Sequence, residues 1–217
     1  MGWPTTCSRR ERRLRSYGRF VQFVDELEFA VGWIAPEPPF MQRTSHAVAA
    51  DGRVWVIDPV DADEALEGVR SLGEPAGVVQ LLDRHNRDCA RVADRLGVPH
   101  HAVPDVAPAG APFEVIPVLR RKRWHEVALW FPEPRTLVCA DALGTAPYYR
   151  APSERIGVSP LLRLTPPRTL LAVEPAHVLV GHGAGVHDDA AAAVRAAVSH
   201  SRRRIPAWLW SALRSRR

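Results

Sequence analysis

The sequence predicts one mixed α/β domain over about residues 20–200, and three observations support this prediction. A strand, a polar loop, a helix and a second strand follow one another between residues 77 and 104, an order typical of parallel strands. Three short β-rich runs then form a meander between residues 112 and 141. A last strand and a last helix complete the domain. The chain has 217 residues, which is long enough to bury one large core.

The first predicted elements are a β-hairpin and a helix. The β-rich runs HAVAA and RVWVIDP flank the dipeptide Asp51-Gly52, which is a strong signal for a tight hairpin turn. A helical stretch then begins at Asp61 and ends at Gly73, because apolar residues recur in it at helical spacing. These apolar residues are Ala65, Leu66, Val69 and Leu72.

The βαβ segment follows directly. Residues 77–83, GVVQLLD, are a short apolar run bounded by glycine and charge, as in a buried strand. The stretch RDCARVADRLGV is a predicted helix that ends at Gly97, and VPHHAVP is the next strand. We expect these two strands to lie parallel to each other.

The second half of the domain begins with the meander PFEVIPVL, EVALWF and RTLVCAD. A proline-rich connection follows at residues 146–167, with a helix predicted around residues 161–171 and interrupted by Pro166-Pro167. AHVLVGHG is the last predicted strand, and DDAAAAVRAAVSHSRRR is the last predicted helix, capped by aspartate.

The positive charge of the chain is concentrated at its ends. Residues 1–19 hold six arginines and one glutamate, and residues 202–217 hold six arginines and no acid. Since the whole chain has a formal net charge of +5, the segment between them is net negative. Solvated tails are the simpler interpretation of arginine-rich ends; binding to nucleic acid or to an acidic surface is the alternative.

The tail at residues 201–217 also has an apolar stripe. At helical spacing, Ile205, Trp208/Leu209 and Ala212/Leu213 share one face, with arginines behind them. Two interpretations stay open at this point. The stripe docks on the body of the domain, or it lies on a membrane surface.

The sequence lacks signals for membrane insertion or export. It has no run of about 18 apolar residues, and its first 20 residues lack the apolar segment of a secretory signal. The cysteines, Cys7, Cys89 and Cys139, are odd in number and widely spaced, so they do not suggest a disulfide framework. We therefore expect a soluble cytoplasmic protein.

Polar residues that could carry chemistry follow three predicted strands. The first group is the loop at residues 83–89, the second is centred on Asp141, and the third is Gly181-His182-Gly183. Loops at strand ends are where α/β proteins usually build their sites. His85, Arg87 and His125 are further candidates for lining the mouth of such a site.

These residues resemble the metallo-β-lactamase superfamily over almost the whole chain. A family strand ending in I-D-x resembles Ile57-Asp58-Pro59, and LGVPHHAVP looks like the next family strand. The family's H-x-H-x-D-H loop corresponds to residues 84–89, its L-x-x-x-D-A-L stretch to residues 137–143, and its closing G-H-G to residues 181–183. The resemblance implies a four-layer αββα sandwich.

The resemblance also implies a metal site that is only partly retained. Three histidines hold the first metal in the family, and their places are taken here by Arg84, Asn86 and, counting back from VALWFPE, Lys122. The positions of the second metal's ligands are Asp88, Cys89, Asp141 and His182. Aspartate, cysteine and histidine are all zinc ligands, so at most one zinc ion per chain is implied.

Two functional hypotheses follow. In the first, one zinc ion at Asp88, Cys89, Asp141 and His182 activates water in a hydrolase, with Asp88 catalytic. Arg84, Asn86 and Lys122, the only lysine of the chain, would then face an anionic group of an unknown small substrate. In the second, no metal binds, and Arg84 and Lys122 pair with Asp88 and Asp141 in a non-catalytic binding or scaffold protein, a pseudoenzyme. Cys89 has a simpler interpretation too, as a small buried apolar residue.

Overall fold

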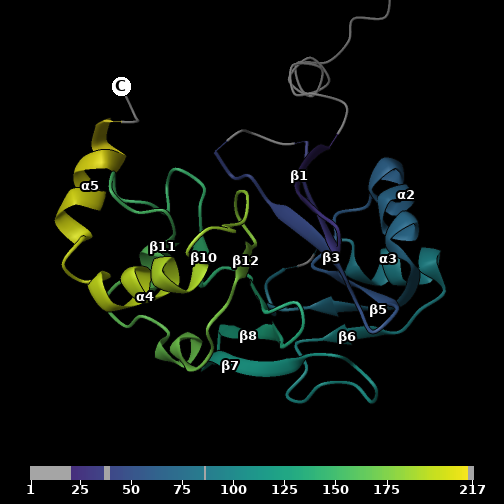
Figure 1. The fold of residues 1–217 in the computed structure, drawn as a ribbon. Coiled ribbons are helices and arrows are strands. Elements are labelled where there is room, and N and C mark those ends of the chain that lie inside the picture. The colour runs from purple at the N-terminus through teal and green to yellow at the C-terminus, as the bar shows by residue number, and fades with distance from the viewer. Residues whose placement is uncertain (1–20, 37–39, 86, 215–217) are drawn as a thin grey trace, which may run out of the picture.

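The computed structural model describes residues 21–36, 40–85 and 87–214, which form four layers in the order helices, sheet, sheet, helices (Figure 1). The predicted αββα sandwich is therefore confirmed. The predicted basic segment at residues 1–19 lies outside the described residues. No helix in the described part of the chain is long and apolar enough to span a membrane.

The first sheet contains the strands of the N-terminal half in chain order. Its outer face is covered by helices α2 and α3, which contact strands β2 to β6. The strands are β1 (Gln22–Leu27), β2 (Ala30–Ile34), β3 (Thr44–Ala50), β4 (Arg53–Ile57), β5 (Glu74–Gln80) and β6 (His100–Ala102), and the helices are α2 (Asp63–Leu72) and α3 (Cys89–Leu96).

The second sheet has the strand order β12-β9-β8-β7. The strands are β7 (Glu114–Arg121), β8 (Trp124–Phe131), β9 (Thr136–Cys139) and β12 (His177–Val180), with a small separate pair, β10 (Leu143–Gly144) and β11 (Gly157–Val158). The outer elements are the 3-10 helices η1 (Pro160–Leu162) and η2 (Arg168–Ala172) and the helices α4 (Ala190–His200) and α5 (Ile205–Arg214).

Alternation along the central strands explains the layers. On β4, Trp55 and Ile57 join the large core between the sheets, whereas Val54 and Val56 join a smaller core under α2 and α3. Successive side chains of a strand point to opposite faces of the sheet. A run of apolar residues such as Val54 to Ile57 is therefore buried on both faces of the sheet. The parallel pairs β4–β5 and β5–β6 confirm the predicted βαβ segment.

The local predictions differ from the structure at a few places. The turn at Asp51-Gly52 forms as predicted, with both residues at positive φ. The helix expected around residues 161–171 is instead two short 3-10 segments, because Pro166-Pro167 removes backbone donors between them. The hairpin of β1 and β2 was not predicted from the sequence, and the last helix is interrupted by a turn at residues 201–204.

The two sheets are tied together beside the loops that carry polar residues. Two backbone hydrogen bonds join the segment after β5 to β8. Val127 N–H donates to Leu81 O at 2.9 Å, and Asp83 N–H donates to His125 O at 3.0 Å. On the other side, Thr44 N–H donates to Gly181 O at 2.9 Å. These bonds bring the ends of β5, β9 and β12 to one place.

A buried ion pair anchors the long loop between β10 and β11. Arg163 donates to Glu154 at 2.6 Å and to Tyr149 O at 2.5 Å, and both charged side chains are almost fully buried. Glu154 also accepts from Ala151 N–H at 2.6 Å. This pair therefore fixes the loop that carries Tyr148 and Tyr149.

We predict that Arg163→Met destabilises the fold by about 3–5 kcal/mol, because a buried carboxylate loses its main partner. Urea unfolding followed by circular dichroism measures the loss. The matched control is Arg195→Met, whose pair with Glu174 is more than half exposed, so its loss should change the stability much less. Equal losses in the two variants would contradict the prediction.

Candidate metal centre

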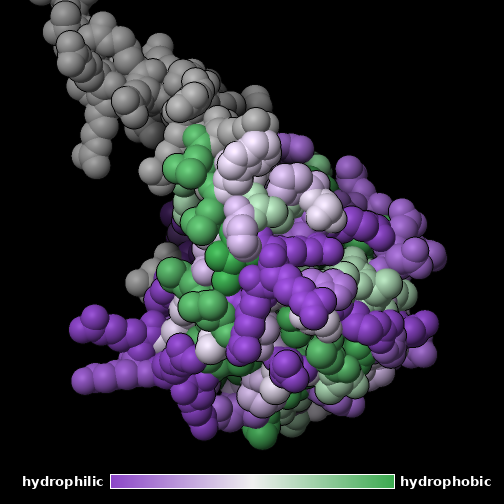
Figure 2. All heavy atoms as spheres, turned by 90° about the vertical axis from the view of Figure 1, so that its left-hand side faces the viewer, coloured by the Kyte–Doolittle hydropathy of each residue, from purple (hydrophilic) through white to green (hydrophobic). Residues whose placement is uncertain are grey.

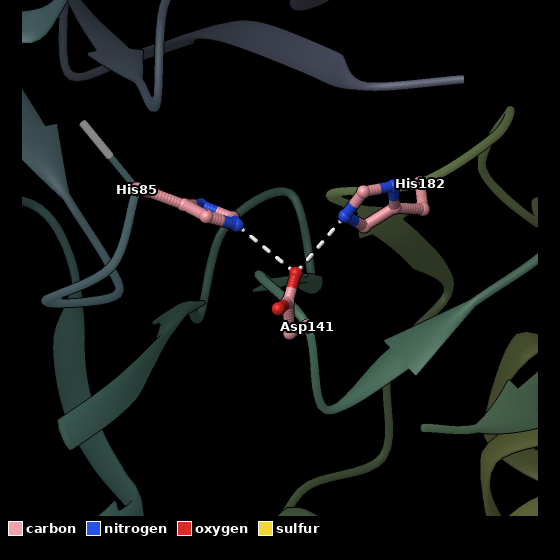
Figure 3. Close-up of side chains that lie close together, drawn as sticks. All are labelled: His85, Asp141 and His182. Atoms are coloured by element: carbon pink, nitrogen blue, oxygen red, sulfur yellow. Dashed lines mark hydrogen bonds and ion pairs between the residues drawn. The ribbon is translucent and has the colours of Figure 1, made fainter. Parts of the chain in front are cut away.

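Three side chains from distant parts of the sequence meet where the strands end. In the parallel pair β9–β12, Cys139 lies opposite Val180, so Asp141 and His182 leave the sheet side by side. The loop after β5 brings His85 to the same place. Figure 3 shows the two imidazole rings on either side of Asp141, each with a nitrogen directed at its carboxylate.

The three side chains converge on one oxygen atom. Asp141 Oδ1 lies 2.9 Å from His85 Nε2 and 3.0 Å from His182 Nε2. One ligand atom from each residue lies within 4.8 Å of the others, the arrangement needed to hold a metal ion. The side chains of His85 and His182 are buried, but that of Asp141 is 21% exposed, so a solute can reach the group from one side.

Both imidazoles are oriented from behind by an acceptor. His182 Nδ1–H donates to the carbonyl oxygen of Met41 at 2.7 Å, and His85 Nδ1 lies 2.8 Å from Asp58 Oδ2. A carbonyl or an ionised carboxylate can only accept, so each Nδ1 carries the proton. The neutral rings therefore present their Nε2 lone pairs to the Asp141 carboxylate, and three electron-rich atoms face one another.

Such an arrangement needs a cation or an additional proton. Burial lowers the pKa of His85, but the Asp58 carboxylate and the hydrogen bond to Asp141 outweigh it and raise the pKa to about 9. Burial would raise the pKa of Asp141, yet the hydrogen bonds from His182 and His85 hold it well below its usual range. In the metal-free protein, His85 is thus an imidazolium between two carboxylates.

Arg84 supplies a second positive charge at the rim. Its guanidinium lies 3.4 Å from Asp141 Oδ2 and 4.1 Å from the ring centroid of Trp124, and its side chain is 42% exposed. The predicted pairing of Arg84 with Asp141 is therefore present in the structure. The stacking on Trp124 holds the planar cation over the site.

Beneath the rim, Glu126 is a buried acid that sequence analysis missed. Glu126 Oε2 accepts from Trp124 Nε1 and Oε1 accepts from Ala142 N–H, both at 2.7 Å. Burial and the nearby charge of Asp141 raise the pKa of Glu126 to about 8. These bonds position the backbone next to Asp141 and the indole under Arg84.

Two tyrosines form the wall behind His182. The Tyr149 ring stacks on the imidazole with centroids 5.5 Å apart, and the Tyr148 ring meets it edge-on at 5.9 Å. The Tyr149 hydroxyl donates to the backbone carbonyl of Asp141 at 3.1 Å. The wall thus fixes both His182 and the turn that carries Asp141.

Arg87 connects the loops rather than lining the mouth of the site. Its guanidinium donates to the carbonyl oxygens of Thr44, Asp58 and Gly181. These carbonyls belong to the start of β3, the loop after β4 and the loop after β12, and a planar guanidinium with five donors can bind all of them at once. Arg87 therefore holds the loops of Asp58 and His182 together.

The structure corrects the ligand set expected from the sequence. Of its four members, only Asp141 and His182 come together, and His85 takes the remaining place. Asp88 accepts from Asp61 N–H at 2.9 Å instead. Cys89 is 1% exposed within the core under α2 and α3, where burial raises the pKa of its thiol to about 12, so the thiolate that a metal needs does not form.

One other predicted position does not join the site. Lys122 is exposed in the turn between β7 and β8, and within the described residues it makes no ion pair with Asp88 or Asp141. Trp124 and Glu126, the next residues along β8, lie closer to the centre: Trp124 is under the Arg84 guanidinium, and Glu126 accepts from Ala142 N–H. Asn86 lies outside the described residues.

Comparison with known proteins agrees with this architecture. No family model matches the sequence, and no curated protein matches it. The structure is similar to that of the DIM-1 metallo-β-lactamase exposed to ceftazidime, with a TM-score of 0.54 and 12% identity over 84% of this chain and 95% of that one. The structure is also similar to that of TMB-1, with a TM-score of 0.53 and 12% identity over 83% of this chain and 98% of that one.

The chain has the metallo-β-lactamase fold. At such low identity the likeness concerns the fold alone. The candidate metal centre lies at the ends of the strands where the sequence resemblance placed Asp141 and His182. It lacks the histidines of the family motif at positions 84 and 89, where arginine and cysteine stand.

We predict that the metal-free protein loses stability as the pH rises. The pKa of His85 lies near 9 in the folded state against a reference of 6.5, and that of Glu126 near 8 against 4.5. Each group binds more protons in the folded than in the unfolded state between its reference pKa and its folded-state pKa. The free energy of unfolding should therefore fall as the pH rises through these two ranges, up to about pH 9. Urea midpoints at a series of pH values measure the decline.

A His85→Asn variant provides the control. It should lack the part of the decline that falls between about pH 6.5 and 9, which belongs to the imidazolium. A wild-type profile that is flat or rises over this interval would show that His85 is neutral in the metal-free protein.

We also predict that Cys89→Ser leaves zinc affinity unchanged but lowers stability by about 1–3 kcal/mol, because it buries a hydroxyl in an apolar core. Isothermal titration with zinc and urea unfolding separate the two effects. A clear loss of zinc affinity at unchanged stability would return Cys89 to the ligand set.

Proposed function

We propose that this protein is a hydrolase that uses one zinc ion held by His85, Asp141 and His182. The observation that carries the proposal is the convergence of two correctly tautomerised imidazoles on one carboxylate oxygen. Each ring donates its Nδ1–H to an acceptor behind it and directs Nε2 at the common point. This is how proteins orient histidine ligands.

The residues present fit a zinc ion. Two histidines and a carboxylate are a donor set of catalytic zinc sites, which keep a further position open for water or substrate. The 21% exposure of Asp141 supports such an open position. When bound, the ion would supply a Lewis acid that activates water and polarises a carbonyl or phosphoryl oxygen.

The side chains around the centre have separate tasks in this proposal. Asp58 and the Met41 carbonyl accept from Nδ1–H of the two rings and so turn both Nε2 atoms toward Asp141. Glu126 and Tyr149 hold the turn that carries Asp141. Arg84 pairs with Asp141 Oδ2 and not with Oδ1, the oxygen on which both imidazoles converge, and its exposed side is available to an anionic group of the substrate.

The charge of Arg84 also favours one ion over two. The guanidinium is 3.4 Å from Asp141 Oδ2, where a second cation would be repelled. The resemblance to the metallo-β-lactamase family places Arg84 at the position of a ligand to the family's first metal. A single ion therefore fits this chain better than a pair.

A hollow beside the His182 loop supports a small anionic substrate. It has a volume of about 420 Å³, and its lining includes Thr145, whose N–H donates to His182 O at 2.9 Å, and Ala184. Two arginines, Arg150 and Arg155, line it, and none of the described residues in its lining is acidic. Such a lining suits a carboxylate or phosphate group.

A second candidate function is a metal-free binding protein, and one observation favours it. His85, Asp58, Asp141 and Arg84 already form a chain of alternating charges within hydrogen-bond or ion-pair distance. An imidazolium at His85 would take the place of the metal charge. Metal content decides between the two candidates.

We predict that each chain binds one equivalent of zinc. Loss of a residue that only hydrogen-bonds to a zinc ligand weakens zinc affinity by roughly 10–100-fold. Because His182 would be a ligand itself, His182→Ala should weaken the affinity by more than this. The metal content of protein purified without a chelating tag and zinc titration of the chelator-treated protein give the numbers. Exposed His100→Ala and Lys122→Met are matched controls that should leave affinity unchanged.

Activity is tested on a panel of chromogenic lactams, esters, thioesters and phosphodiesters. Turnover should require zinc, disappear in His182→Ala and persist in Lys122→Met. If the protein is purified without zinc and does not bind added zinc, the hydrolase proposal is contradicted and the metal-free binding protein is favoured. Two tightly bound equivalents would show that Arg84 does not exclude a second ion.

A further inference from the structure

Helix α5 has one docked side and one side that faces solvent. Trp208 docks: its Nε1–H donates to Tyr148 O at 2.7 Å, and the guanidinium of Arg163 lies 5.5 Å from its ring centroid. Ile205 is half-buried on the same helix. The predicted docking on the body is therefore present, but it accounts for only part of the apolar stripe.

The remaining apolar side chains are exposed and extend beyond the helix. Leu164 is next to the start of α5, because its carbonyl accepts from Arg202 Nε at 2.8 Å. Figure 2 views the side of the molecule on which α4 and α5 lie, where hydrophobic and hydrophilic side chains are interspersed. We define the apolar patch as the five exposed residues Leu161 (73%), Leu164 (66%), Leu209 (48%), Trp210 (53%) and Leu213 (66%).

The surroundings of the apolar patch are strongly basic. From residue 190 to residue 217 the sequence has seven arginines and no aspartate or glutamate. Arg202 and Arg203, in the turn before α5, are exposed. Large exposed leucines and tryptophans in such a setting call for an explanation, because soluble surfaces rarely group them.

A partner must satisfy both the apolar and the basic groups. Nucleic acid would pair with the arginines but leave the leucines in water. A second copy of the chain would cover the leucines but bring the two basic surfaces together. The surface of an anionic membrane satisfies both, since leucine and tryptophan enter the interface while arginines bind lipid headgroups.

The shape of the patch also favours a broad surface over a groove. Leu161 and Leu164 come from the connection before η2, so the apolar area is wider than one helix. The opposite side of α5 is already fixed by Trp208. A groove takes up the apolar face of a single helix, whereas this area combines residues of α5 with two leucines from another segment.

We propose that α5 and the adjoining Leu161–Leu164 segment bind the surface of a membrane rich in anionic lipid. The leucines and Trp210 contribute apolar contact with the headgroup–acyl boundary, and the exposed Arg202 and Arg203 contribute attraction to the lipid charge. This inference is independent of the metal centre and of the proposed hydrolase activity.

Co-sedimentation of the full chain with vesicles tests the proposal. We expect binding to phosphatidylcholine vesicles that contain phosphatidylglycerol, little binding to phosphatidylcholine alone, and weaker binding as salt is raised. The double variant Leu209→Ser/Leu213→Ser should lower the partition coefficient about tenfold or more, because it removes apolar contact and leaves every arginine in place. The control Val106→Ser, at an even more exposed apolar residue outside the patch, should bind like the wild type.

Three outcomes would overturn the proposal. The first is equal vesicle binding by the wild type and the double variant, which would assign it to the arginine-rich ends alone. The second is binding to duplex DNA without any binding to vesicles. The third is a concentration-dependent dimer in sedimentation velocity that the double variant abolishes, with no vesicle binding, which would identify a second copy as the occupant.

Discussion

The convergence of His85 and His182 on Asp141 Oδ1 is the interaction on which the structure of the site depends. Each residue belongs to a different strand end, and each is fixed by bonds that cross between the sheets. Asp141 follows β9, His182 follows the adjacent parallel strand, and the loop of His85 is pinned to β8. The site therefore forms only when both sheets and their connections are in place.

The electrostatics around this point explain how so many charged groups can lie close together in a folded protein. Asp58 and Asp141 place two carboxylates on one imidazole, and Arg84 neutralises part of the charge from outside. A proton on His85 and a metal ion at Nε2 are alternative ways of supplying the missing positive charge. Metal binding thus displaces a proton, which couples the site to pH.

The loops behind the site connect it to the C-terminal helix. Glu154 and Arg163 hold the segment that presents Tyr148 and Tyr149 to His182, and Trp208 of α5 donates to the carbonyl of Tyr148. The same buried arginine lies beneath the Trp208 ring. The wall of the metal centre and the surface with the apolar patch therefore share one set of anchors.

The sequence by itself determined the elements and two of the three side chains at the centre. The Asp51-Gly52 turn, the βαβ order and the strand ends before Asp141 and His182 are local signals, and a parallel pair fixes which strand ends are neighbours. Only the tertiary structure decided that His85, not Asp88 or Cys89, faces the site. Backbone torsions decide which side chain of a short loop points inward. In this loop the torsions are set by two backbone hydrogen bonds, from Asp83 N–H to His125 O and from Asp88 N–H to Pro59 O. Likewise only the tertiary structure showed that Glu126 and Trp124, and not Lys122, lie beside the centre, because the turn between β7 and β8 leaves Lys122 exposed.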